Sequence, residues 1–331
     1  MKAGEIMPSD LVGKKRFLVS RTQTFYDDDK WRDDVDLVDE RTYVLARARK
    51  FPRLAHQWAL WWFKLQFALR LLVVSRGYRG VAVGRYGMYL PALQRLLGIR
   101  KPVVMMDVEW PKVKRGIIAR AAALGSRAVM AFTSVEIQRY SQQYKIPPTK
   151  FVLSFAPFEM RCIYPVSDDG YIFSGGVESR DWETLARAIE SLPYPVRVFS
   201  REPMPFAAAN VTVSSVSEEE YFRQMARASC VVITLRPEPL RITGMRTWTA
   251  AMAMGKVVIV TEPLGAPEYM QNGISGFYTN YGDWNGVRRY IVQVMEDDEV
   301  RRAVGQAARE RAWKEFSPNA FRSRVLALLD S

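Results

Sequence analysis

The 331-residue sequence has few of the residues that form disulfides or bind transition metals. It contains two cysteines, Cys162 and Cys230, and a single histidine, His56. The cysteines lie far apart and match no metal-ligand spacing, so neither a disulfide framework nor a zinc site is supported. We therefore expect a protein of a reducing cytoplasm without a bound metal, and a structural or surface role for His56.

Long apolar runs are also missing. The opening residues MKAGEIMPSDLVGKK have no apolar core before their basic residues, so we predict no secretory signal. The most apolar run, residues 55–75, is interrupted by His56, Gln57, Lys64, Gln66 and Arg70. It is too polar for a helix that spans a bilayer, and we expect none.

Acidic residues are scarce in the first half of the chain. Residues 1–165 hold 29 Lys and Arg against 14 Asp and Glu, whereas residues 166–331 hold 19 against 21. The two halves therefore carry +15 and −2. This asymmetry indicates that the first half meets an anionic partner, such as a membrane surface, nucleic acid or a phosphorylated substrate, unless its arginines are simply solvated.

The sequence also lacks the short signatures of two protein classes that its composition allows. No GxGxxG follows an early strand, and RFLVSRTQTF has no glycine, which disfavours a nicotinamide-dependent oxidoreductase. No RRM, KH or zinc-finger pattern accompanies the positive charge, which disfavours a nucleic-acid-binding protein. Both remain alternatives to the function predicted below.

The pattern that is present is a regular alternation of buried strands and amphipathic helices. In the second half, we expect strands at YIFSGG, PVRVFS, NVTVSS, CVVITL and KVVIVT, with helices between them, one of them capped by Ser217. The first half follows the same order, with strands expected at RFLVS, TYVLA, GVAV, PVVMM and AVMAF. The alternation predicts an α/β protein with two Rossmann-like, doubly wound domains that face a central cleft.

The expected domain limits follow from one irregular segment. Residues 153–170 have little periodicity and contain Pro157 and Pro165, which is typical of a linker. We predict a first domain at 1–160, a second domain at 161–305, and a C-terminal segment at 306–331 that packs back on the first domain. Two helices broken at Ser317 and Pro318 should form its end.

Two glycine-containing turns are candidate anion sites. Thr243 and Gly244 precede a helix of small residues, so Gly244 lets the backbone approach a ligand and the free amides of Met245 and Arg246 favour a diphosphate. Arg246 and Thr247 are further donors. In the second turn, Gly175 and Gly176 end a strand, and Arg180 lies at the start of the next helix, where a guanidinium binds phosphate well.

The quoted residues resemble the group 1 nucleotide-sugar glycosyltransferases of the GT-B fold, also known as glycosyltransferase family 4. The segments YIFSGGVESRDWETLARAI and AMAMGKVVIVTEPLGAPEYMQNGISGFYTNYGD are similar to the family's donor domain, and residues 128–158 are similar to the end of its acceptor domain. The resemblance covers most of residues 80–285. The first 50 residues match poorly.

By this resemblance Arg180 contacts the donor diphosphate, and so do the amides that follow Gly244. The family usually has two glutamates eight positions apart near this loop, the later one on the donor ribose, and neither is present here. Glu268 and Thr249 are the candidates for ribose recognition. Gly176 replaces the family's second basic residue, and the resemblance favours retention of the anomeric configuration.

The acceptor side has candidates for proton transfer. In MMDVEWP, Asp107 and Glu109 follow an expected strand and point to one side of it, where an acid can take a proton from a hydroxyl. Asp107 is the predicted base, and salt bridging is as plausible for Glu109. Arg85 and Tyr86, after GVAV, are further candidates.

One helix offers two interpretations. At 100° per residue, one face of it carries Trp58, Trp61, Trp62, Leu65, Leu69, Leu72 and Val73. Such a face is ordinary core, or it lies among lipid headgroups with help from the basic residues of 112–127. The acidic run at 27–34 is interpreted as a solvated loop and not a metal site.

Together these features predict a cytoplasmic glycosyltransferase of hexosyltransferase type, peripheral on the inner face of the membrane. It would use a nucleotide-diphosphate sugar as its substrate, with no separate cofactor. Its other predicted partners are a glycan or glycolipid acceptor and an anionic membrane surface, with no nucleic acid.

Overall fold

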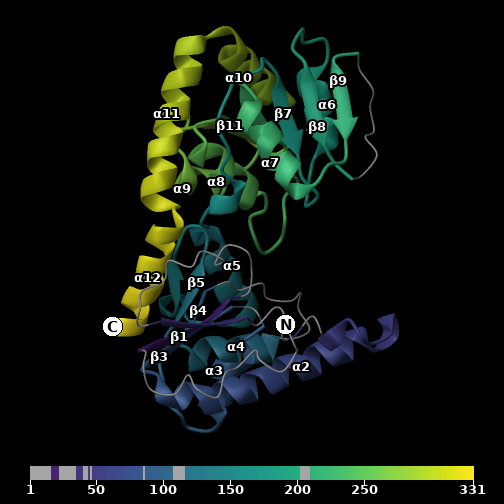
Figure 1. Cartoon of the computed structure of the whole chain (residues 1–331). Coiled ribbons are helices and arrows are strands. Elements are labelled where there is room, and N and C mark those ends of the chain that lie inside the picture. The colour runs from purple at the N-terminus through teal and green to yellow at the C-terminus, as the bar shows by residue number, and fades with distance from the viewer. Residues whose placement is uncertain are drawn as a thin grey trace. The chain divides into compact units, whose positions relative to one another are not determined.

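A computed structural model describes residues 16–21, 35–39, 44, 47–84, 86–106, 116–201 and 209–331 of the chain. The chain forms two compact units (Figure 1). The N-terminal unit contains Met1–Ser154 and Phe321–Ser331, and the C-terminal unit contains Phe155–Ala320. Residues 155–160 and 306–320, which the sequence analysis placed elsewhere, therefore belong to the C-terminal unit.

The N-terminal unit is built on a six-stranded parallel sheet with the order β2-β1-β3-β4-β5-β6. Its strands are β1 (Phe17–Arg21), β2 (Val35–Asp39), β3 (Gly80–Val83), β4 (Val103–Met105), β5 (Ala128–Ala131) and β6 (Phe151–Leu153). Its helices are α2 (Arg53–Val74), α3 (Tyr89–Leu96), α4 (Gly116–Gly125), α5 (Ser134–Tyr144) and α12 (Pro318–Asp330).

Of the strand predicted at TYVLA, only Val44 lies among the described residues, and it is helical. The second strand is instead VDLVD at Val35–Asp39, which pairs in parallel with β1. VDLVD is no more apolar than TYVLA, so its composition does not mark it as the strand. Its position in the sheet follows from tertiary contacts, in which Val35 and Val38 are buried.

The last helix completes the core of the N-terminal unit. Four buried residues of α12 pack in one cluster with side chains of the sheet: Phe321, Val325, Leu326 and Leu329. Their partners include Phe17 of β1 and Val104 of β4. Residues separated by some 300 positions in sequence thus share one apolar core, and the helix break predicted at Ser317 and Pro318 is present.

The C-terminal unit has a second six-stranded parallel sheet, with the order β12-β11-β10-β7-β8-β9. Its strands are β7 (Ile172–Gly175), β8 (Val196–Phe199), β9 (Val211–Ser214), β10 (Cys230–Ile233), β11 (Val257–Val260) and β12 (Phe277–Tyr278). Its helices are α6 (Trp182–Ile189), α7 (Glu218–Arg227), α8 (Met245–Ala253), α9 (Ala266–Tyr269), α10 (Trp284–Glu296) and α11 (Asp298–Glu315). The predicted α/β class with two doubly wound sheets is confirmed.

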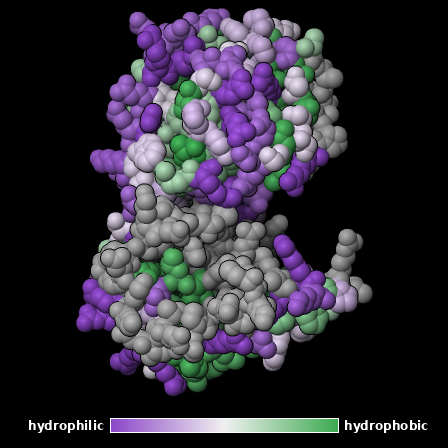
Figure 2. All heavy atoms as spheres, viewed as in Figure 1, coloured by the Kyte–Doolittle hydropathy of each residue, from purple (hydrophilic) through white to green (hydrophobic). Residues whose placement is uncertain are grey.

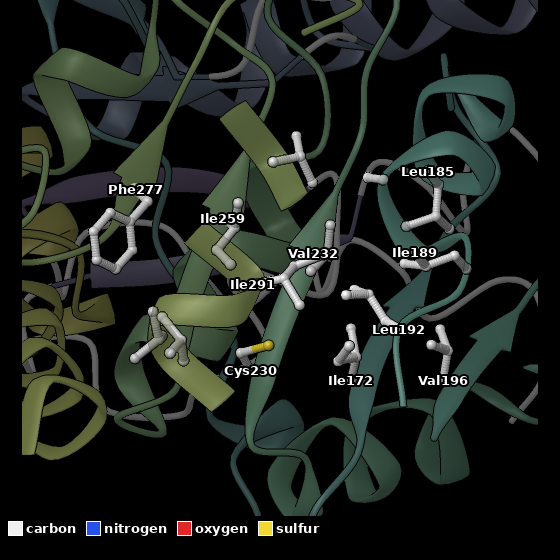
Figure 3. Close-up of a cluster of buried hydrophobic side chains, with 14 of the residues drawn as sticks. Ile172, Leu185, Ile189, Leu192, Val196, Cys230, Val232, Ile259, Phe277 and Ile291 are labelled. Atoms are coloured by element: carbon white, nitrogen blue, oxygen red, sulfur yellow. The ribbon is translucent and has the colours of Figure 1, made fainter. Parts of the chain in front are cut away.

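The C-terminal core lies between the sheet and the helices that connect its strands. Figure 3 shows Leu185 and Ile189 of α6 near strand residues such as Ile172 and Val232, all of which are buried. On the face drawn in Figure 2, hydrophilic side chains cover much of the described surface of this unit. Burial of one apolar stripe per helix is what holds each helix against the sheet.

Side-chain caps begin several helices of the C-terminal unit. Ser217, the predicted cap, accepts a hydrogen bond from the amide of Glu220 at 3.2 Å. Asp181 caps α6 and Asp283 caps α10 in the same way. Helix α8 differs, because Gly244 begins it without any side-chain cap.

A buried lysine ties the amino ends of the central strands together. The Nζ of Lys256, the residue before β11, donates hydrogen bonds to the carbonyls of Ser167 at 2.6 Å and Ala228 at 2.7 Å. Lys256 is 5% exposed, and burial lowers the pKa of its ammonium to about 8.

Stability should therefore depend on pH through Lys256. Because the folded protein releases this proton at a lower pH than the unfolded chain does, the free energy of unfolding should rise as pH increases from about 8 to about 10.5. Denaturant unfolding at several pH values in this range should show that the free energy of unfolding rises more in wild type than in Lys256→Met. The same pH dependence of the free energy of unfolding in both proteins would contradict a lowered pKa of Lys256.

Candidate functional site

The candidate site lies where the strand order of the C-terminal sheet reverses. Strands β7 and β10 are neighbours, and the chain leaves them toward opposite edges of the sheet. In such sheets the loops at the carboxyl ends of these two strands separate and form a natural ligand crevice. Both predicted glycine turns follow these strands.

Hydrogen bonds join the two loops. The amide of Asp181 donates to the carbonyl of Thr234 at 3.0 Å, and the amide of Arg236 donates to the carbonyl of Ser179 at 2.8 Å. Ser179 has a φ of 53°, an uncommon value for a residue with a side chain. The loop after β7 is thus fixed against the loop after β10 at some cost in backbone strain.

Gly176 makes room for the Arg180 side chain. A Cβ at Gly176 would lie 2.2 Å from one terminal nitrogen of the Arg180 guanidinium, and the backbone has a φ of +117°. The Nε of Arg180 donates to the carbonyl of Gly175 at 2.7 Å, and Nη1 donates to the carbonyl of Glu178 at 2.8 Å. The guanidinium is therefore held flat against the turn by main-chain acceptors.

Arg180 is a buried cation without an ion pair in the described part of the chain. It is 7% exposed, and burial lowers the pKa of its guanidinium, which still stays protonated at neutral pH. Of the acids next to it in sequence, Asp181 caps α6 and Glu178 forms its salt bridge with Arg241 at 3.0 Å. A buried charge without a counterion is costly, so this arrangement suits a site that receives an anion.

Gly244 brings the start of helix α8 to the same place. A Cβ on Gly244, which has a φ of +81°, would lie 3.5 Å from Nη1 of Arg180. The amides of Thr247 and Trp248 bond to the carbonyl of Gly244, and those of Met245 and Arg246 have no acceptor among the described residues. The first turn of α8 contains no acidic residue that would occupy these amides.

Tyr221 of α7 supports this pair of turns from below. Its ring would lie 2.7 Å from a Cβ at Gly175, and its hydroxyl lies 3.4 Å from Oγ1 of Thr247. Burial raises the pKa of Tyr221, so the phenol stays neutral beside Arg180 and does not cancel its charge. No pattern in the sequence predicted Tyr221, since only the packing of α7 reveals it.

The Arg246 side chain belongs to a closed ring of ion pairs. It bonds to Glu159 and, at 2.9 Å, to Glu218, and Arg161 bonds to the same two carboxylates at 2.7 and 2.9 Å. These ion pairs therefore compete with the predicted binding of an anion by the Arg246 side chain. The ring instead ties the segment before β7 to the first turns of α7 and α8.

A third loop, after β11, packs against the same region. Glu262 is 1% exposed and accepts hydrogen bonds from the amides of Leu264 and Gly265, at 3.1 and 2.7 Å, and from the Tyr281 hydroxyl. A Cβ at Gly265 would lie 2.9 Å from Ile242, two residues before Gly244. Glu262 was missed, although its place directly after a strand was a usable signal.

The candidates for ribose recognition have different surroundings. Thr249 is fully buried, and its hydroxyl donates to the carbonyl of Met245 at 2.8 Å, so a ligand at the surface does not reach it. Glu268 lies on α9 and is partly exposed, and its carbonyl accepts from Arg311 at 2.8 Å. Thr243 is 7% exposed next to Gly244.

Most of the predicted acceptor-side residues lie outside the described part of the chain. Arg85, Asp107 and Glu109 lie outside the described residues. Tyr86 follows β3 and is 5% exposed, with the Nζ of Lys64 5.1 Å from its ring centroid. Among the residues that the structure describes, no cluster of His, Cys, Asp or Glu is suited to hold a metal ion.

The sequence comparison matches part of the C-terminal unit to a known family. Residues 211–311 match the family profile described as Glycosyl transferases group 1, a segment that includes Gly244 and Glu268 but not Arg180. The resemblance to the group 1 glycosyltransferases is confirmed. The chain is also 38% identical over 66 residues to N-acetyl-alpha-D-glucosaminyl L-malate synthase of Bacillus anthracis and 28% identical over 107 residues to the lipopolysaccharide core biosynthesis glycosyltransferase LpsE of Rhizobium meliloti (strain 1021).

These two matches cover 20% and 32% of the chain, and the chain spans only 17% and 30% of the length of the two relatives. Solved structures extend the likeness to the whole fold. Anabaena HepE in complex with UDP superimposes with a TM-score of 0.68 at 14% identity, over 95% of this chain and 99% of the other. Sucrose-phosphate synthase of Thermosynechococcus elongatus gives 0.67 at 14% identity, over 96% and 98%. The group 1 sequence match therefore lies within a chain that has the GT-B fold.

Replacing Gly176 tests the packing of Arg180. In Gly176→Ala the new methyl group would displace the guanidinium, so we expect a loss of more than about 2 kcal/mol in the free energy of unfolding. Gly170→Ala is the matched control, because Gly170 has a φ of +74° and open space around it and so costs only about 1 kcal/mol. Equal losses in the two variants would show that Arg180 does not occupy the space beside Gly176.

Proposed function

We propose that this protein transfers a hexosyl group from a nucleotide-diphosphate sugar to an acceptor hydroxyl. The observation that carries the proposal is the unpaired, buried guanidinium of Arg180 beside the uncapped start of α8 at Gly244. Two positive groups converge there, and no carboxylate of the described residues forms an ion pair with Arg180. The group 1 match and the GT-B fold support a nucleotide-diphosphate as the missing partner.

The proposed catalysis is mainly electrostatic. As the sugar leaves, negative charge grows on the terminal phosphate of the diphosphate, and the Arg180 guanidinium stabilises it at close range. The amides of Met245 and Arg246 donate to the same phosphates, and the helix terminus adds about half a positive charge. Removal of one preorganised donor of this kind typically slows such reactions about 100- to 1,000-fold.

The other substrate groups are assigned less directly. UDP is the first nucleotide to test, because UDP complexes are known for the similarly folded Anabaena HepE. Asp107 is the proposed base for the acceptor hydroxyl, and Glu109, Arg85 and Tyr86 are the other candidates on the acceptor side. Retention of configuration and a glycan or glycolipid acceptor rest on the family resemblance, and we propose no cofactor besides the donor and no nucleic-acid partner.

Nucleotide binding can be measured by thermal shift. UDP, GDP, ADP and NAD should be compared, and a nucleoside diphosphate at 100 times its Kd should stabilise the protein by about 2.7 kcal/mol. In Arg180→Met this stabilisation should be largely lost because the diphosphate loses its charged partner. Arg302→Met, which removes an exposed arginine of α11, is the charge-matched control and should respond like wild type.

A larger shift with NAD than with any nucleoside diphosphate would contradict the proposal in favour of an oxidoreductase. If a nucleoside diphosphate gives the larger shift, product analysis with a set of nucleotide sugars would identify the donor and the configuration of the product.

We also propose a cytoplasmic protein that binds the inner membrane surface through its N-terminal unit. The residues expected to form a core face of α2 do not all do so: Trp58, Trp62, Leu69 and Val73 are 74, 50, 46 and 61% exposed. At 100° per residue these four lie within about 60° of one another, opposite the buried Phe67 and Leu71. Exposed tryptophans on a helix in a basic unit suit a lipid headgroup layer.

The described part of the chain contains no helix long and apolar enough to cross a membrane, so attachment would be peripheral. Vesicle flotation tests this directly. Trp58→Ser with Trp62→Ser should lower recovery with anionic vesicles severalfold, and added salt should lower it further. Val166→Ser with Ile274→Ser, at 50 and 51% exposure in the C-terminal unit, is the matched control. Recovery of wild type only in the soluble fraction at low salt would reject membrane binding.

A further inference from the structure

A basic pocket lies in the N-terminal unit at the amino ends of strands β4 and β5. It has a volume of about 380 Å³, and its walls are formed by the segment before β4 and the segment before β5. Four cationic residues line it: Arg95, Arg100, Lys101 and Arg127. The carboxyl ends of the same strands, which lead toward the predicted acceptor residues, are at the opposite edge of the sheet.

The cations of this pocket have no carboxylate partner among the described residues. Lys101 donates to main-chain carbonyls at the end of α2, including that of Arg76 at 3.3 Å, and Arg127 lies 3.4 Å from the Ser331 hydroxyl. Lys150 is close by, because its Nζ donates to the carbonyl of Ser126 in the pocket wall at 2.7 Å. Its pKa is lowered by burial and by repulsion from Arg95, which indicates a locally positive field.

Helix ends do not explain this amount of charge. The C-terminal ends of α2, α3 and α4 meet here, and each contributes about half a negative charge that a basic residue can complement. Three such ends amount to roughly −1.5, against five cations counting Lys150. A net positive charge of about 3.5 remains unbalanced.

Acidic residues are absent from a long stretch of the sequence around the pocket. Residues 41–106 contain 13 Lys and Arg and no Asp or Glu at all. This stretch includes α2, α3 and the segment before β4. The positive field therefore extends beyond the pocket, and an anionic surface would meet no local repulsion.

Exposed apolar residues border the same pocket. Leu96, Leu97 and Ile99 are 81, 57 and 39% exposed, and they alternate in sequence with the lining residues Arg95, Gly98 and Arg100. A free phosphate ion has no apolar surface that could pack against them. A phospholipid presents a phosphate and hydrocarbon together, so it fits both the cations and the apolar rim.

We infer that this pocket binds the phosphate of an anionic phospholipid headgroup, with Arg100 and Arg127 as its main ligands and Leu96 and Leu97 at the acyl boundary. The inference deepens the proposed membrane binding and rests on it. A volume of 380 Å³ is within the range of small-ligand pockets, so a headgroup can enter it.

The test compares vesicles of phosphatidylcholine alone with vesicles that also contain phosphatidic acid, and uses inorganic phosphate as a soluble competitor. Wild type should prefer phosphatidic acid, and phosphate should compete. Arg100→Ser with Arg127→Ser should weaken binding about 30-fold, because each surface cation contributes roughly fivefold. Arg100→Lys with Arg127→Lys should retain most of the binding.

The control Arg302→Ser with Arg309→Ser removes two exposed arginines of α11 and should bind like wild type. Unchanged binding by Arg100→Ser with Arg127→Ser, while Trp58→Ser with Trp62→Ser binds weakly, would overturn the pocket inference and leave membrane binding intact. Competition by phosphate without any preference for phosphatidic acid would overturn the lipid assignment. Failure of wild type to bind any anionic vesicle would overturn membrane binding and this inference together, without affecting nucleotide binding.

Discussion

The buried guanidinium of Arg180 is the constraint around which the donor-side loops are arranged. Two main-chain carbonyls hold it, at Gly175 and Glu178, and the missing side chain of Gly176 makes the space that it fills. Neither carbonyl neutralises a full positive charge. Burial of such a charge to 7% exposure costs free energy of folding, and the binding of an anion is the simplest function for which a protein keeps it.

The surrounding contacts hold the Arg180 guanidinium and the loops around it in place. Tyr221 packs beneath it as a neutral phenol, the start of α8 adds free amides, and Glu262 holds the loop after β11 through main-chain donors. Nearby carboxylates are engaged elsewhere: Glu178 with Arg241, and Glu159 and Glu218 with Arg161 and Arg246. The charges are distributed so that no described acid competes with a bound phosphate at Arg180.

Much of the fold was predictable because both sheets are parallel and buried. Strands such as CVVITL and KVVIVT are continuous β-branched runs, and the intervening helices have one apolar stripe each, so the alternation can be recognised without tertiary information. The exposed tryptophans of α2 show where such a pattern is not sufficient. Local pattern identifies an apolar segment but cannot identify what covers it.

The site was predictable to a similar degree. Gly176, Arg180 and Gly244 carried visible signals, since glycine marks a close approach and arginine marks an anion, and their proximity follows from the strand order. Tyr221 and the ion pairs of Arg246 depend on side-chain packing between α7, α8 and the segment before β7, which spacing alone does not encode. The most direct measurement of the central claim is a crystal structure of the protein with UDP. The account predicts diphosphate oxygens within hydrogen-bond distance of the Arg180 guanidinium and of the amides of Met245 and Arg246, and a diphosphate bound away from Arg180 would contradict it.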